Sequence, residues 1–130
     1  MTSLGRAVLH QEAGCRTVIM GVTRDGKCEV EEFLAGLPPK AQDKFLALFE
    51  RYCKIGYLRS PDVMRLIQAP GAPPVHEIKV HWGPGYRLFG VVDGDAFVAT
   101  HGARKPKKLP SHVKRARDRY AESCEKWEKR

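Results

Sequence analysis

Three strand-like runs in residues 75–101 follow one another with only short glycine-containing turns between them. The runs are rich in β-branched and aromatic residues and occupy residues 75–81, 86–93 and 96–101. The connections GPG (residues 83–85) and DGD (residues 93–95) are of the kind that favours antiparallel hairpins. Because consecutive hairpins form a meander, this part of the chain is expected to fold as a mostly antiparallel sheet.

A further strand and two helices are expected before the meander. Residues 17–23 (TVIMGVT) form a β-branched run that a DG turn signal closes. A first helix is predicted by apolar residues at i, i+3, i+4 and i+7, namely Val30, Phe33, Leu34 and Leu37. A second helix is predicted from Pro39 to about Ile55, and the proline-rich residues 68–74 form a loop after it.

A basic helix is expected from Pro110 or Ser111 to Glu128. Its narrow apolar seam consists of Val113, Ala116, Tyr120, Cys124 and Trp127. The predicted fold class is therefore α+β: a four-stranded, mostly antiparallel sheet packed on one face by the two N-terminal helices, with this helix at the C-terminal end. With 130 residues in all, residues 15–130 fit a single domain, and residues 1–14 are expected to be a flexible leader.

Several classes of protein are excluded by simple patterns. No apolar run approaches the roughly 20 residues that span a bilayer, and residues 1–14 lack the apolar centre of a signal peptide, so a soluble, cytoplasmic protein without membrane partners is expected. The 4 cysteines form no CxxC pair, and the 5 histidines form no HExxH motif. Reduced thiols, no metal site and no cofactor are therefore expected.

Positive charge is concentrated at the C-terminal end. Residues 1–100 hold 12 basic and 11 acidic residues, whereas residues 101–130 hold 11 basic and 4 acidic residues. A basic segment on a nearly neutral body suggests a surface that meets phosphates, because local potential concentrates polyanions. A solvated basic helix and a surface for an acidic protein partner remain alternative interpretations.

The alternation of strand side chains predicts a cationic cleft. Lys79 and His81 share one face of their strand, and an arginine, Arg87, lies in the middle strand of the meander, where a charge needs a partner or a purpose. In the next strand Ala99 and His101 share a face, and Arg104 and Lys105 follow it. RNA hydrolysis without a metal needs a base, an acid and cations for the charged phosphorane, and these residue types can supply all three.

These residues also carry a resemblance. Residues 76–120 (HEIKVHWGPGYRLFGVVDGDAFVATHGARKPKKLPSHVKRARDRY) resemble the core of RelE/HigB-like toxins of bacterial toxin-antitoxin modules, in particular the phage-derived HigB branch of the RelE/ParE superfamily. Residues 30–52 (VEEFLAGLPPKAQDKFLALFERY) resemble the paired N-terminal helices of that branch. The resemblance covers roughly residues 15–121 in family order.

The resemblance implies a ribosome-dependent, metal-independent endoribonuclease that cleaves mRNA and inhibits translation, and an antitoxin partner, commonly a helix-turn-helix protein. Lys79, Arg87 and Arg104 match the family residues that bind the scissile phosphate. His81 and His101 are the candidates for the proton-transfer groups, as histidine-bearing members of the superfamily suggest. RelE-type enzymes carry a second lysine where this chain has Glu77.

The basic residues after the meander are the RNA-binding candidates: Lys105, Lys107, Lys108, Lys114 and Arg115. Two other functions are compatible with the sequence. A ParE-like protein would inhibit DNA gyrase through protein contacts and leave RNA intact. A phage or prophage nucleic-acid-binding module would use the same basic segment without chemistry.

Overall fold

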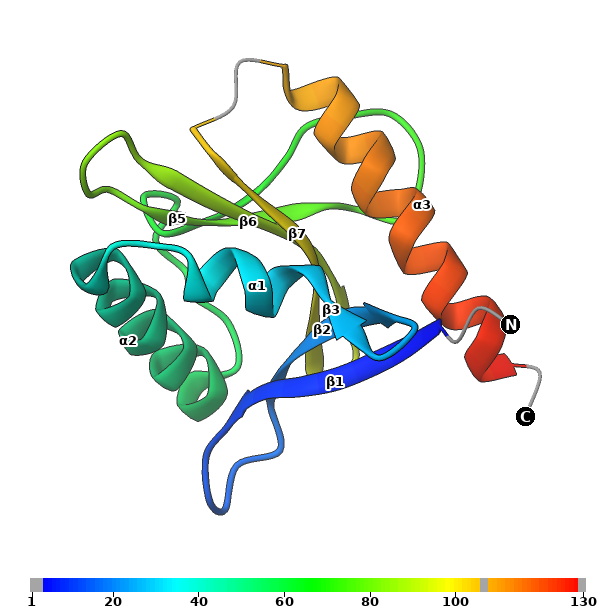
Figure 1. Ribbon diagram of the computed structural model, residues 1–130, viewed down its shortest axis with the longest axis horizontal. Helices are drawn as coiled ribbons and strands as arrows, with labels where there is room; N and C mark the ends of the chain where they lie inside the picture. The colour runs from blue at the N-terminus through cyan, green and yellow to red at the C-terminus, as the bar shows by residue number, and fades with distance from the viewer. Residues whose placement is uncertain (1–3, 106–107, 129–130) are drawn as a thin grey trace.

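The computed structural model describes the backbone of residues 4–105 and 108–128 and the side chains of residues 5–105 and 108–124. In these ranges the chain forms a sheet and three helices (Figure 1). The strands are β1 (Leu4–Gln11), β2 (Val18–Arg24), β3 (Lys27–Cys28), β4 (Met64–Leu66), β5 (His76–Val80), β6 (Tyr86–Asp93) and β7 (Ala96–Arg104). The helices are α1 (Glu29–Ala35), α2 (Pro39–Ile55) and α3 (Leu109–Glu128).

The sheet is larger than the predicted one and mixed in direction. Its seven strands run in the order β1-β2-β7-β6-β5-β4, with β3 paired to β2. The β2–β7 pair is parallel, and the meander β5-β6-β7 is antiparallel as expected. The prediction of a four-stranded, mostly antiparallel sheet is therefore wrong. The sequence pattern missed β3 and β4 because strands of two and three residues are too short for an alternation to be visible.

The N-terminal segment also differs from the expectation. Residues 4–11, inside the expected flexible leader, form β1, which pairs antiparallel with β2. The sequence LGRAVLHQ lacks a regular apolar and polar alternation, so it does not look like a strand by itself. A register shift between Val8 and His10 marks an irregularity in this ladder. Pairing with β2 therefore gives this segment its structure.

Helices pack on both faces of the sheet, and not on one face only. The core under α1 and α2 includes Phe45, Tyr52, Leu88 and Phe97. The core on the opposite face, under α3, consists of Ile67, Val75, Phe89, Val91, Val113 and Ala116. Figure 1 shows the sheet running between α2 and α3. Each face of the central strands is thus covered by apolar side chains, and the α3 face is the one that also carries charged groups.

The predicted helices are all present. Pro39 begins α2, as expected from its fixed φ, and Gly56 follows its end with φ 88°, the left-handed conformation that glycine adopts most easily. In α3 the predicted seam is buried at Val113 and Ala116, while Tyr120 is half-buried and donates a hydrogen bond to Asp93. Trp127 lies outside the described side chains.

A β-bulge in β7 changes which side chains share a face. Gly90 pairs with Ala99 but Phe89 pairs with His101, so Thr100 is an extra residue without a partner in β6. As a result Ala99 packs in the α1/α2 core, whereas His101 lies on the α3 face beside Phe89. The expectation that Ala99 and His101 share a face was therefore wrong, because strict alternation fails across a bulge.

Candidate functional site

Four charged side chains meet on the α3 face of strands β4, β5 and β6. Lys79 lies directly opposite Arg87 in the β5–β6 ladder, and Arg65 lies directly opposite Glu77 in the β4–β5 ladder. Since cross-strand partners point to the same side of a sheet, all four share one face. We call Arg65, Glu77, Lys79 and Arg87 the charged cluster.

Glu77 is the centre of the charged cluster and is only 1% exposed. Its Oε1 atom lies 2.7 Å from Nη2 of Arg65, and its Oε2 atom lies 3.9 Å from Nε of Arg87. Among the described residues, neither carboxylate oxygen has a donor in hydrogen-bond geometry. Because a buried carboxylate is unfavourable without cations nearby, Glu77 holds the two arginines toward each other.

The charged cluster has an excess of positive charge, with three cations and one carboxylate. Burial lowers the pKa of the Lys79 ammonium, and the neighbouring Arg65 guanidinium lowers it further. Burial also lowers the pKa of Arg87, against the opposing effect of Glu77. Crowded, partly desolvated cations are stabilised by an added anion, so this face is suited to binding a phosphate group.

Lys105 lies at the end of the same face. Its backbone N–H donates to the carbonyl of Gly85, and a Cβ atom at Gly85 would lie 3.6 Å from Cβ of Lys105 and 3.8 Å from Nη1 of Arg87. Gly85 has φ 85° and thus keeps the turn tight at this point. The backbone places Lys105 next to Arg87, in agreement with the predicted convergence of these two residues.

Arg104 does not join the charged cluster. In the β6–β7 ladder Arg104 lies opposite Tyr86, which packs in the α1/α2 core, and Arg87 lies opposite Ala103. Cross-strand partners share a face of the sheet. The exposed Arg104 side chain therefore extends from the α1/α2 face, and the charged cluster lies on the α3 face. Lys79 and Arg87 therefore lie together as expected, but Arg104, the third residue of the expected phosphate-binding set, does not lie with them.

The two predicted histidines occupy very different environments. His81 follows the end of β5, is exposed, and its Nε2 lies 2.6 Å from the carbonyl oxygen of Asp62. A carbonyl only accepts, so Nε2 carries the proton and Nδ1 is the basic nitrogen of His81. His101 is completely buried on the α3 face, so it has no access to a substrate in this structure.

A chain of hydrogen bonds fixes the tautomers around His101. The Thr100 hydroxyl donates to the carbonyl of Phe89, so its oxygen accepts from Nδ1 of His101 at 3.1 Å. Nε2 of His101 must then accept from Nδ1 of His112, 3.0 Å away. In this assignment Nε2 of His112 is unprotonated, and it lies at the partly exposed end of the hydrogen-bond chain.

His112 on α3 belongs to no motif or periodic pattern in the sequence. Its ring stacks on Phe89 with centroids 4.8 Å apart, and Phe89 lies opposite Glu77 in the sheet. Burial and Arg115 lower the pKa of His112. His112 is therefore a neutral base near the charged cluster, and its position in a basic helix sequence gave no signal of this contact.

The buried histidine should make stability depend on pH. Burial, Arg115 and His112 lower the pKa of His101 from 6.5 to about 3, so between these values the unfolded chain binds more protons than the folded one. Stability is then complete above pH 6.5 and falls on acidification by up to about 1.4 kcal/mol per pH unit, or about 2 kcal/mol by pH 5. Urea unfolding at pH 7.5 and 5.0 measures this loss. The His101→Phe variant should lose less between the two values, and an equal loss would contradict the assignment.

The predicted RNA-binding residues differ in whether their side chains already form ion pairs. Lys108 is exposed, but Lys114 pairs with Asp118 at 2.8 Å and Arg115 pairs with Glu29 at 2.7 Å. Lys107 lies outside the described residues. Exposed ion pairs of this kind contribute little to stability. Lys114 and Arg115 can therefore bind a polyanion, but each must first break its ion pair.

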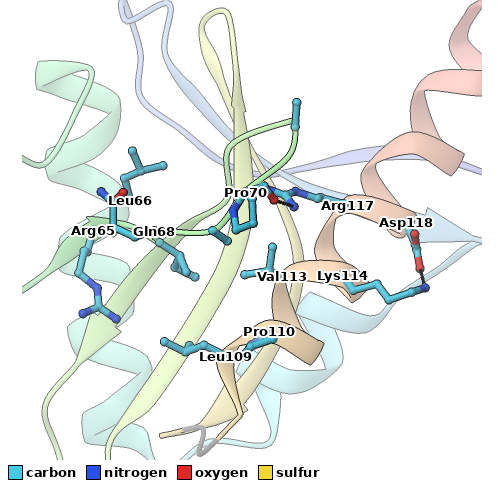
Figure 2. A pocket seen from close by; sticks show the side chains of 13 residues that line it. Arg65, Leu66, Gln68, Pro70, Leu109, Pro110, Val113, Lys114, Arg117 and Asp118 are labelled. Carbon is cyan, nitrogen blue, oxygen red and sulfur yellow. Dashed lines mark hydrogen bonds and ion pairs between the residues drawn. The ribbon is translucent and has the colours of Figure 1, made fainter.

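A groove of about 710 Å³ lies beside the charged cluster, between the proline-rich segment and α3 (Figure 2). Arg65 lines it and thus belongs to both features. The apolar residues that line it include Ala69, Pro70, Leu109, Pro110 and Val113. Arg117 ties the two walls together, because its guanidinium donates to the carbonyl oxygens of Pro70 and Pro73 at 2.8 and 2.9 Å.

Comparison with protein families, with curated proteins and with solved structures finds no match to this chain. Within the described residues, no three His, Cys, Asp or Glu side chains come together in a way that could hold a metal ion. None of the helices in that part of the chain is both long enough and apolar enough to cross a membrane.

Proposed function

We propose that this protein is a toxin of the RelE/HigB type, an endoribonuclease that cleaves mRNA on the ribosome. The observation that carries the proposal is the cross-strand pair of Lys79 and Arg87 beside the buried Glu77. Two cations on adjacent strands can contact the same phosphate, and the Arg87 guanidinium can donate two hydrogen bonds to it. The proposal also rests on the order of helices, meander and basic helix that underlies the family resemblance.

The proposed chemistry requires no metal. The 2′-oxygen of a ribose attacks the adjacent phosphorus, its proton goes to a base, and the bond from phosphorus to the 5′-oxygen breaks as that oxygen takes up a proton. Lys79 and Arg87 would stabilise the charge that develops on the phosphorane. By the hydrogen-bond assignment, Nε2 of His112 and Nδ1 of His81 are unprotonated. We propose them, in place of the buried His101, as the nitrogens that can take the 2′-hydroxyl proton, and the 5′-oxygen takes its proton from water.

The partners follow from the same proposal. Ribosomes hold the substrate mRNA in the cytoplasm, and the exposed cations Lys105 and Lys108 would contact ribosomal or messenger RNA there. An antitoxin, expected to be a helix-turn-helix protein, would restrain the enzyme in its host.

Lys79→Ala is expected to lower mRNA cleavage about a hundredfold, the usual cost of removing one donor to a developing oxyanion. Arg104→Ala is the matched control, because it removes a cation from the same region on the other face of the sheet and should leave cleavage nearly unchanged. Inducible expression in a bacterium, with growth recorded and new mRNA 5′ ends mapped, measures both effects. The wild type should arrest growth and produce cuts inside translated frames.

Other outcomes would overturn parts of this proposal. Growth arrest without new 5′ ends would contradict the nuclease and favour the ParE-like contact with gyrase. RNA binding without arrest or cuts would favour the non-catalytic nucleic-acid-binding module. Equal loss in Lys79→Ala and Arg104→Ala would show that the phosphate is not bound where the charged cluster lies.

A further inference from the structure

We infer that the groove between the proline-rich segment and α3 binds the base of a nucleotide whose phosphate is held by Arg65. This inference rests on the proposed function, and it adds a base-binding subsite to the proposed phosphate site. Arg65 links the charged cluster to the groove, because it pairs with Glu77 in the cluster and also lines the groove. Its side chain is 45% exposed. A phosphate bound at its free side brings the attached nucleoside to the groove.

The size and walls of the groove suit a nucleobase. Its volume of about 710 Å³ lies within the range of roughly 300–1,000 Å³ that is usual for small-ligand sites. Leu109 and Val113 of α3 form one apolar wall, and Ala69 and Pro70 lie on the other side. Apolar surfaces on two sides can pack against the two faces of a base, and Arg65 can stack on a base as well.

Gln68 supplies a polar group for the edge of a base. Its side chain is exposed, lines the groove, and makes no hydrogen bond with any side chain or backbone that the structure describes. Figure 2 shows Gln68 next to Arg65 among the residues that line the groove. An amide offers both a donor and an acceptor, so Gln68 can bond a base edge that presents either.

The charge around the groove favours a nucleotide over a basic or neutral protein segment as its occupant. Three cations line it, Arg65, Lys114 and Arg117, against the single carboxylate of Asp118. Arg117 is already engaged by backbone carbonyls, so it stiffens the groove without competing for a ligand. A rigid, positive groove with apolar walls needs little rearrangement when a single-stranded nucleotide binds.

The test compares two short single-stranded RNA oligonucleotides, one complete and one with an abasic ribose in its centre. Binding to the full chain is followed by NMR of the leucine and valine methyl groups. The complete RNA should shift the methyl signals of Leu109 and Val113 and bind about tenfold more tightly than the abasic RNA. Inorganic phosphate should leave these methyl signals in place.

Gln68→Ala provides the variant arm of the test. It should weaken binding of the complete RNA about fivefold and leave binding of the abasic RNA unchanged, since only a hydrogen bond to the base is lost. The control is Gln11→Ala, an exposed glutamine in β1 at the opposite edge of the sheet. Both positions are exposed, so both variants are expected to fold.

Each result decides the inference separately from the nuclease proposal. Equal binding of the two RNAs, or equal effects of the two glutamine variants, would overturn the base subsite even if cleavage depends on Lys79. Methyl shifts confined to the complete RNA would support the subsite even if no cuts appear in cells. Absence of any shift at Leu109 and Val113 would also overturn it, and the groove would then be available to a protein segment.

Discussion

Glu77→Ala is expected to lower the free energy of unfolding by about 3–5 kcal/mol, the usual cost of removing one partner from a buried ion pair. Glu77 is 1% exposed and the Arg87 side chain is 8% exposed, so little water can reach the guanidinium that loses its partner. The variant would leave Arg87 facing Lys79 and Arg65 with no negative charge between them. Urea unfolding of the wild type and the variant at neutral pH measures the difference.

Two comparisons make the Glu77 prediction specific. Glu122→Ala removes the carboxylate of an exposed pair with Arg24 and should cost about 0–1 kcal/mol. Glu77→Gln keeps the volume of the side chain and removes only the charge, so a large loss in this variant would assign the effect to electrostatics. A loss below about 1 kcal/mol in both Glu77 variants would contradict the ion-pair argument.

Gly90→Ala is expected to destabilise the fold by about 3 kcal/mol, at the upper end of the cost of overpacking a core. A Cβ atom at Gly90 would lie 2.5 Å from the carbonyl oxygen of Val98 and 2.6 Å from the ring of Phe97. The carbonyl belongs to the backbone of the central strand β7 and cannot swing away. Thermal or urea unfolding of the variant measures the loss.

Gly5→Ala is the matched control for this substitution. Gly5 also lies in a strand, but a Cβ atom there would lie 3.5 Å from the Thr23 hydroxyl oxygen, which is an ordinary contact. Alanine at Gly5 should therefore be neutral or slightly stabilising, because it restricts the unfolded chain. Similar losses at Gly5 and Gly90 would mean that the close approach beside the bulge is not the cause.

The outcome at Gly90 also bears on the proposed site. The bulge beside it moves His101 to the α3 face and places Ala103, rather than Gly102, opposite Arg87. A variant that folds with a changed register in β7 would alter which basic residue lies near the charged cluster. The close fit of β6 against β7 at Gly90 thus maintains the arrangement of the cations as well as the stability of the sheet.

The candidate site was only partly predictable from the sequence. The proximity of Lys79 and Arg87 could be predicted, because a short glycine-containing connection pairs their strands and strand alternation shows which side chains share a face. Arg65 lies between a helix and the proline-rich loop, and Gln68 begins that loop, so no periodic pattern shows what these two residues face. His112 looked like one polar residue in a basic helix, and only its stacking on Phe89 reveals its position.

The sequence by itself determined the local elements: three helices, the hairpins of the meander, and the concentration of basic residues after it. These features depend on periodicity, proline, glycine and charge, all of which act over a few residues. Only the tertiary structure decided that β2 runs parallel to β7, that residues 4–11 form a strand, and that α3 covers the second face. The partners in these contacts are far apart along the chain, so the physical reason for each arrangement is burial against a distant segment that no local pattern specifies.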